Sequence, residues 1–147
     1  MNKFTRVALP FAIALALSAC QETPAETQED VADAQVEAAE EVGEARQDAR
    51  EVANDANRDV NDAWAEGDSD DVADARADAT EDTAQARHEV AMARAQGTLD
   101  VAQERCDALT GQDKDACDAA AKAEFEAAKA VADNELEAAE RAADRID

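Results

Sequence analysis

The sequence lacks most of the residues on which catalytic sites depend. It contains no tyrosine, one histidine (His88) and one tryptophan (Trp64), and its only serine after Cys20 is Ser69. Nucleophilic catalysis needs a nucleophile, a base and a group that orients the base, and these residues do not supply such a set. No glycine-rich phosphate loop is present. We therefore expect neither an enzyme nor a bound cofactor.

Large apolar side chains are scarce beyond the first twenty residues. That part of the chain holds nine valines, three leucines, one isoleucine and one phenylalanine. Highly charged chains with so few large apolar residues border on disorder. Alanine is abundant instead, and no proline follows Pro24, so nothing obliges a helix to break. The composition favours helices that hold together weakly, and it leaves partial disorder open.

Basic residues are also few. The chain has 14 Lys and Arg against 37 Asp and Glu, a formal net charge of −23. Lys3 and Arg6 are the only charged residues before Cys20, so the rest of the chain is more acidic still. A charge of this size repels phosphate-rich surfaces and attracts cations or basic proteins. We expect no nucleic-acid partner.

The first twenty residues are built differently from the rest. Lys3 and Arg6 form a basic head, and the apolar run over 7–17 is shorter than the roughly 20 residues that span a bilayer. Small residues then lead to Cys20, as in a secretory signal. The tetrad resembles the lipobox of bacterial lipoproteins: Leu17, Ser18, Ala19, Cys20. The resemblance implies cleavage between Ala19 and Cys20, a diacylglycerol on the Cys20 sulfur, and therefore attachment to a membrane.

The chain divides into three parts. Residues 1–19 are the expected signal peptide, and residues 20–29 are polar, contain Pro24 and show no apolar period. We interpret them as a flexible tether. Residues 30–147 form an Ala-rich acidic region with helical periodicity.

A single apolar stripe predicts the first helix over 28–66. Ala and Val recur at steps of three or four residues: Val31, Ala34, Ala38, Val42, Ala45, Ala49, Val52, Ala56, Val60, Ala63. Gly67 is then suited to a left-handed C-cap, and Asp68 begins an N-cap with acids after it. Such a turn aligns positions of two antiparallel helices whose numbers sum to about 135.

Two further helices are expected over 69–109 and 114–145. In the second, Gly97 would permit a break, but the apolar stripes favour continuity. A turn around Gly111 follows, with Asp113 as the predicted N-cap of the last helix. The fold class is therefore all-α, as elongated antiparallel helical hairpins or a three-helix coiled-coil-like bundle, with a homo-oligomer left open.

Cys106 and Cys117 flank the Gly111 turn almost symmetrically. An exported protein meets an oxidising compartment, so these cysteines are expected to form a disulfide. Their pairing sets Leu99 against Phe125, in a register where facing numbers sum to about 223. The segment 106–117, followed by an Ala-rich helix, resembles a recurring segment of uncharacterised exported proteobacterial proteins. That resemblance implies a helical hairpin and no particular activity.

An acid ladder at i, i+4 spacing runs along the second helix: Asp70, Asp74, Asp78, Asp82. Like charges at this spacing each destabilise a helix by about 0.2–0.5 kcal/mol. The register at Gly67 does not pair the ladder with the arginines of the first helix. The ladder is thus either a solvated face or a docking face for divalent cations or a basic envelope protein.

Three other sequence patterns are not expected to form functional sites. The segment 55–66 has ligand spacing similar to an EF-hand loop, but Val60 stands where glycine is required, so no metal site is expected. His88 and Glu89 begin a zinc-protease motif that Met92 interrupts, and His88 is expected to be solvated. Trp64 is expected to be a packing anchor.

The resemblance to bacterial lipoproteins implies a lipid-anchored protein at the periplasmic face of the outer membrane, because in that family an Asp at the position of Gln21 would favour inner-membrane retention. Its predicted role is structural, as a spacer or a protein-binding element of the envelope. Ala-rich helical lipoproteins resemble the murein lipoprotein, but this chain ends in Asp147 and not in a linking lysine. The alternative is an acidic, partly disordered protectant that binds cations or cationic peptides.

Overall fold

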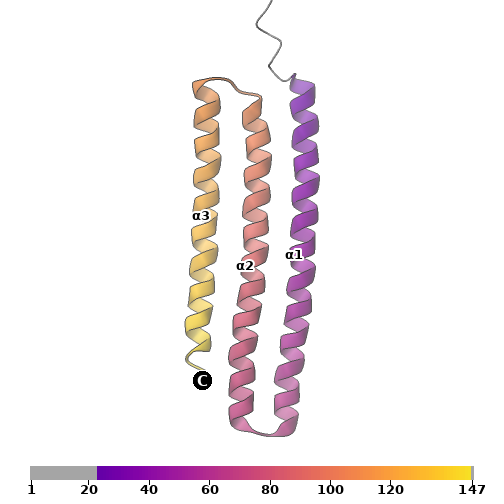
Figure 1. The fold of residues 1–147 in the computed structure, drawn as a ribbon, viewed down its shortest axis with the longest axis vertical. Helices are drawn as coiled ribbons and strands as arrows, with labels where there is room; N and C mark the ends of the chain where they lie inside the picture. The colour runs from indigo at the N-terminus through magenta and orange to yellow at the C-terminus, as the bar shows by residue number, and fades with distance from the viewer. Residues whose placement is uncertain (1–22, 147) are drawn as a thin grey trace, which may run out of the picture.

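Three long helices lie antiparallel and side by side in the computed structural model, which describes residues 23–146 (Figure 1). They are α1 (Pro24–Glu66), α2 (Ser69–Asp107) and α3 (Gln112–Ala143). The central helix α2 packs against both neighbours, and within residues 23–146 no Cα atom of α1 lies within 8 Å of one in α3. The all-α prediction is confirmed, as two hairpins that share α2.

The first helix begins earlier than predicted. Thr23 caps it in a reciprocal arrangement: its N–H donates to Glu26 Oε2 at 2.8 Å, and the Glu26 N–H donates to Thr23 Oγ1 at 3.3 Å. Pro24 occupies the first turn, where a missing N–H costs no hydrogen bond. The prediction of a flexible tether through residue 29 is therefore wrong from Pro24 onward, because a capping box and a helix-compatible proline start α1 there.

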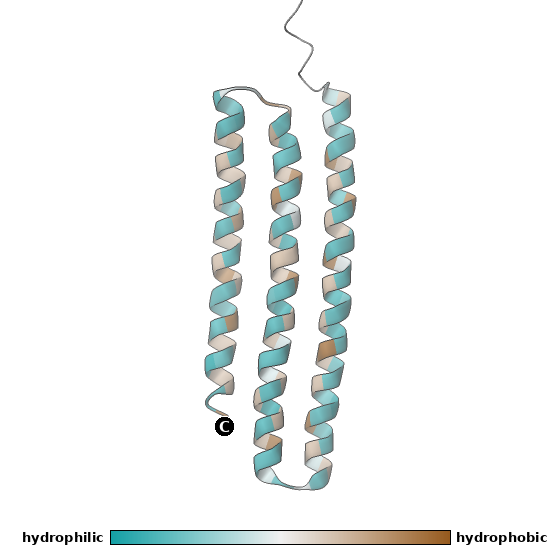
Figure 2. Cartoon of the chain, viewed as in Figure 1, coloured by the Kyte–Doolittle hydropathy of each residue, from teal (hydrophilic) through white to brown (hydrophobic). Residues whose placement is uncertain are grey.

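The apolar stripe of α1 faces α2 as predicted. All ten stripe positions are buried or half-buried, whereas Val36, which lies off the stripe, is 58% exposed. Figure 2 shows that apolar and hydrophilic residues alternate along all three helices, without a long apolar run. The buried core is consequently thin and mostly alanine: Ala56, Val72, Ala77, Ala86, Val90, Ala95, Cys106, Ala121, Ala132, Ala143.

The α1–α2 turn follows the predicted caps. Gly67 adopts a left-handed conformation (φ 84°), and its N–H donates to the Ala63 carbonyl at 3.3 Å. The Asp68 side chain accepts from the Asp70 N–H at 3.0 Å and starts α2. Glycine tolerates this φ because it has no Cβ.

The backbones of α1 and α2 approach closely where Gly97 meets Ala38. A Cβ added to Gly97 would lie 2.5 Å from the Ala38 Cβ, which is less than two carbon atoms allow. The pair also confirms the predicted register, in which facing numbers sum to about 135. Helix α2 continues through Gly97 without a break, so the glycine serves close packing and not a kink.

The start of α3 corrects another prediction. Gly111, with φ 59°, is the N-cap, and the helix begins at Gln112. The Gly111 carbonyl already accepts from the Asp115 N–H at 3.1 Å. Asp113, the predicted cap, instead lies in the first turn, where its negative charge is favourable near the helix N-terminus.

Candidate functional site

The expected cleavage and lipidation positions, Ala19 and Cys20, lie outside the described residues. The nearest described residue is Thr23, three positions beyond Cys20. The start of α1 lies at the same end of the molecule as the α2–α3 turn, and the Gly67 turn lies at the opposite end (Figure 1). At 1.5 Å per residue, the 43 residues of α1 separate these ends by about 65 Å.

A disulfide closes the α2–α3 turn, as predicted. Cys106 and Cys117 are bonded, with their Cα atoms 5.6 Å apart, and Cys106 is fully buried. Next to it, Lys114 forms ion pairs with Asp107 of α2 and, at 3.7 Å, with Asp118 of α3. The hydrogen bond to Asp107 raises the pKa of the Lys114 ammonium. This end of the hairpin is held by both covalent and ionic links.

His88 makes the second link between α2 and α3. Its Nε2 lies 2.8 Å from Asp133 Oδ1, and Lys129 forms an ion pair with the other oxygen of the same carboxylate. Hydrogen bonds from Lys129 and then from His88 lower the pKa of Asp133. The His88 side chain is only 19% exposed, so the prediction of a solvated histidine is wrong. The sequence does contain a signal for this pair: in the register where facing numbers sum to about 223, His88 falls opposite position 135, two residues from Asp133.

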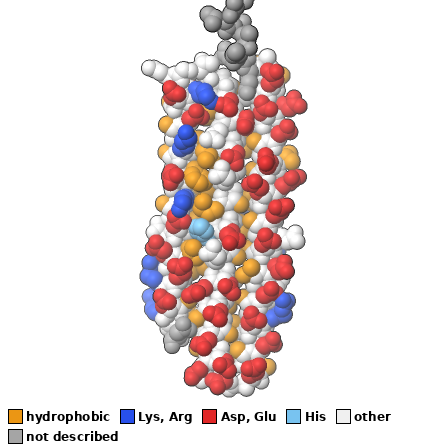
Figure 3. All heavy atoms as spheres, viewed as in Figure 1, with side chains coloured by type: hydrophobic (Ala, Val, Ile, Leu, Met, Phe, Trp, Pro, Cys, Tyr) orange, Lys and Arg blue, Asp and Glu red, His pale blue; other side chains and the backbone are white. Residues whose placement is uncertain are grey.

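The acid ladder (Asp70, Asp74, Asp78, Asp82) lies in exposed positions along α2. Within residues 23–146 no ion pair involves these four side chains. On the face that Figure 3 shows, acidic side chains lie over all three helices, and most of the basic side chains visible there lie along the α3 side. The ladder thus belongs to a broader acidic surface.

Two acidic grooves follow the α1–α2 seam. One, of about 240 Å³, is lined by Glu37 and Glu41 of α1 and by Asp100 and Glu104 of α2. The other, of about 300 Å³, has this acidic lining: Asp55, Asp59, Asp82, Glu89. Neither groove has Lys or Arg among its described lining residues. We refer to the surface around them as the acidic face.

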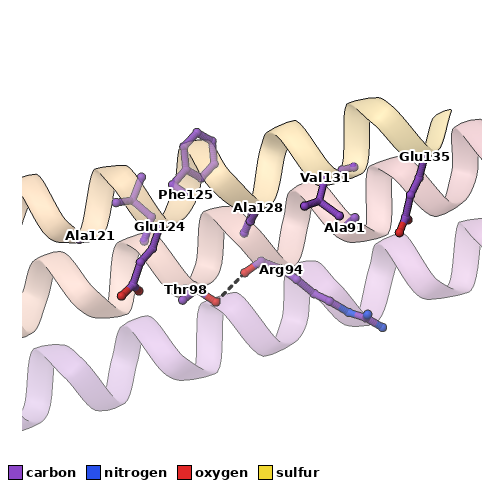
Figure 4. A pocket seen from close by; sticks show the side chains of 12 residues that line it. Ala91, Arg94, Thr98, Ala121, Glu124, Phe125, Ala128, Val131 and Glu135 are labelled. Carbon is purple, nitrogen blue, oxygen red and sulfur yellow. Dashed lines mark hydrogen bonds between the residues drawn. The ribbon is translucent and has the colours of Figure 1, made fainter. Parts of the chain in front are cut away.

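A groove of different character follows the α2–α3 seam. Its upper part, about 370 Å³, has an apolar lining that includes Leu99, Phe125 and Val131 (Figure 4). Arg94 of α2 lies at its edge, and Glu124 and Glu135 lie on the α3 side. The register predicted from the cysteines, which sets Leu99 against Phe125, is confirmed here. The sequence stripes indicated that these helices would meet but did not reveal an open groove.

Two other sequence patterns do not form sites. The EF-hand-like segment 55–66 is part of helix α1, where Asn57 donates to the Ala53 carbonyl and Arg58 pairs with Asp55. Trp64 is 58% exposed, with the Arg76 guanidinium 5.2 Å from its ring centroid. The expected packing anchor is therefore wrong: Trp64 contacts α2 through a cation–π interaction at the surface.

Within residues 23–146, no three acidic, His or Cys side chains are placed to hold a metal ion. None of the described helices is both long and apolar enough to cross a bilayer. Comparisons with protein-family models, with curated proteins and with solved structures find no match to this chain. The function must therefore be inferred from the residues and their arrangement.

Proposed function

We propose that the protein is a non-catalytic lipoprotein, anchored through Cys20 at the periplasmic face of the outer membrane, whose helical layer acts as a spacer or protein-binding element of the envelope. The lipobox tetrad ending at Cys20 is the observation that carries this proposal. The scarcity of catalytic side chains supports a structural role.

The early start of α1 sharpens the proposal. Only residues 21 and 22 separate the acylated Cys20 from the Thr23 cap, and an extended chain over these three steps reaches about 10 Å. The lipid would hold the disulfide end of the layer close to the membrane. The Gly67 turn, about 65 Å away at 1.5 Å per residue, would then lie farthest from it.

The acidic face gives this proposal its second part, an interaction with divalent cations or a basic envelope protein. Its supporting observation is the exposed acid ladder beside grooves that lack basic residues. Self-association remains a further proposal for the same layer. The alternative of a disordered protectant has less support, because residues 24–143 are helical apart from two short turns.

Replacement of the lipidated cysteine tests the anchor. Cys20→Ser should move the protein from the membrane fraction to the soluble periplasmic fraction, because no acyl chain is attached. The helical circular dichroism spectrum should not change. Ser18→Thr serves as a matched control, and its product should stay with membranes. A Cys20→Ser protein that still sediments with membranes and carries acyl groups by mass spectrometry would refute the proposal.

A further inference from the structure

The arginines of α1 and α2 are placed with a regularity that the proposed anchor does not explain. Helix α2 has four arginines, at positions separated by 11, 7 and 11 residues: Arg76, Arg87, Arg94, Arg105. Intervals of 7 and 11 residues return to nearly the same side of a helix. All four arginines therefore share one side of α2.

That side is nearly opposite to the acidic face. Asp82 and Glu89, which line an acidic groove, precede Arg87 and Arg94 by five residues each. Five residues turn an α-helix by about 140° beyond a full turn. Arg46 and Arg50 of α1 extend the same surface: they stand seven residues before the groove-lining Ala53 and Asn57. We call the surface that carries these six arginines the arginine face.

Most of these arginines have no acidic partner. Within residues 23–146 no ion pair involves five of the six: Arg46, Arg50, Arg87, Arg94, Arg105. The sixth, Arg76, lies over the Trp64 ring. The chain has 37 acidic residues to 14 basic ones, so carboxylates are abundant. The arginines are unpaired because the carboxylates of α1 and α2 gather on the other face.

An apolar groove runs along the arginine face. The groove at Phe125 adjoins a second one through Ala91, Ala132 and Glu135, and that one adjoins a third through Arg87. Together they extend along α2 from Arg76 to Leu99, about 35 Å at 1.5 Å per residue.

The groove has the shape of a binding site for an α-helix, with a buried floor and an exposed wall. Its floor includes Ala95 and Ala132, which are 7% and 3% exposed, while Val131 on its wall is 58% exposed. In the third part, of about 500 Å³, the lining residues come from all three helices, with α2 between α1 and α3. A fourth helix laid there would convert the three-helix layer into a four-helix arrangement.

We propose that the arginine face binds an acidic amphipathic helix of a partner protein. Apolar residues of the partner would fill the groove, as in other helix-in-groove complexes. Its carboxylates, spaced by 7 and 11 residues, would pair with Arg76, Arg87 and Arg94 along α2. Glu124 and Glu135 of α3 also line the groove, so the partner's acids are placed against the arginines of α2 and not against α3.

Charge and shape favour an acidic helix in the groove over a second copy of the protein and over a bilayer surface. A second copy placed face to face, with α2 on α2, would bring one arginine row onto the other. A bilayer surface is too flat to enter the third part of the groove, which residues of both α1 and α3 line. The net charge of −23 repels an acidic partner at a distance, but salt screens this repulsion beyond about 8 Å at physiological ionic strength.

The test uses the whole protein, purified in detergent, and a synthetic helical peptide of about 25 residues, which matches the groove length at 1.5 Å per residue. The peptide carries a leucine stripe and glutamates at the 7- and 11-residue intervals. A control peptide has lysines in place of these glutamates. Binding is measured by fluorescence anisotropy.

Arg87→Glu combined with Arg94→Glu should raise the Kd of the glutamate peptide about tenfold, or 1.4 kcal/mol. Arg87→Gln with Arg94→Gln should raise it less. The matched control is Lys122→Glu with Arg145→Glu, which changes the net charge equally at exposed positions outside the groove. It should change the Kd less than twofold, and circular dichroism should show that all variants remain helical.

Three outcomes would overturn the proposal: tighter binding of the lysine peptide, sedimentation as a dimer that the Arg87 and Arg94 substitutions abolish, or arginine-dependent binding to phosphatidylglycerol vesicles without peptide binding. The inference rests on the proposed protein-binding role, but its test does not depend on the anchor. The Cys20→Ser protein should bind the peptide with unchanged Kd. The membrane-fractionation test of the anchor and the peptide-binding test of the groove can therefore fail independently.

Discussion

The two seams of the helical layer are held in different ways. Between α1 and α2, Gly97 lies against Ala38 and the backbones approach closely. Between α2 and α3, a disulfide and the His88–Asp133 pair link the helices, and an open groove lies beside them. Within residues 23–146, the ion pairs that join two helices all belong to the α2–α3 seam.

The contrast shows how a chain with few large apolar residues packs long helices. Small residues allow close approach, which recovers dispersion contacts without bulky side chains. Where larger side chains such as Leu99 and Phe125 line an open groove, covalent and ionic links add stability. The two hairpins should therefore respond differently to mutation.

Loss of the disulfide should have the largest effect. Cys106→Ala with Cys117→Ala removes a link across an 11-residue separation, which should cost about 3 kcal/mol because the unfolded chain regains freedom. Hydrogen exchange should show the loss of protection mainly in α3. Equal loss in α1 and α3 would mean that the seams unfold as one unit, and the contrast between them would not hold.

Gly97→Ala should weaken the other seam. The new Cβ would lie 2.5 Å from the Ala38 Cβ, and overpacking of this kind costs about 1–3 kcal/mol. Better helix propensity returns about 1 kcal/mol, so we expect a net loss near 1 kcal/mol in urea unfolding. Adding Ala38→Gly should recover part of it. A Gly97→Ala protein more stable than the wild type would show that the approach is not tight.

Gly43→Ala is the matched control on the outer side of α1, away from the seam. Nothing lies within 4 Å of a Cβ at Gly43, and the residue is inside α1. The substitution should therefore stabilise the protein by about 0.5–1 kcal/mol through helix propensity alone. Thermal unfolding followed by circular dichroism measures the change. Destabilisation here would indicate that the outer side of α1 is covered.

The smallest expected effect is a change of the melting temperature with pH. The pKa of Asp133 is held below its usual 3.8 by Lys129 and then by His88. Its stabilising contribution is thus present above about pH 4 and is lost as the pH falls through the lowered pKa. Wild type should exceed Asp133→Asn in melting temperature at neutral pH, and the gap should close in acid.

Asp74→Asn provides the contrast for this pH series. Asp74 belongs to the exposed ladder, with like charges four residues away on each side. Its removal should raise the melting temperature slightly at neutral pH, because repulsion at i, i+4 is relieved. If Asp133→Asn raises the melting temperature at neutral pH, as Asp74→Asn is expected to do, the ionic link between α2 and α3 contributes nothing.

Periodicity and turn chemistry predicted much of the fold. The α1 stripe, the Gly67 cap, the continuity of α2 and both registers follow from local rules that act within one helix or one turn. The start of α1 was also readable, since Thr23, Pro24 and Glu26 form a capping-box sequence. It was missed because the polar composition around Pro24 also suits a linker.

The surfaces were less accessible to sequence reasoning. Helix α2 has apolar residues on two sides because it faces two neighbours, and only the structure shows that α1 and α3 stay apart. The faces of the molecule on which Arg87, His88 and Asp133 lie depend on that arrangement. Their roles could therefore not be derived from spacing in a single helix.

The disulfide also determines what a protease would release. A cut in the turn between Cys106 and Cys117 leaves α2 and α3 covalently joined, because the bond spans the break. The Gly67 turn has no such bridge, so a cut there separates α1 from the rest of the chain. If Cys20 is acylated, that single cut would leave α1 on the membrane, and the other two helices, as one cross-linked fragment, would be held there only by their packing against α1.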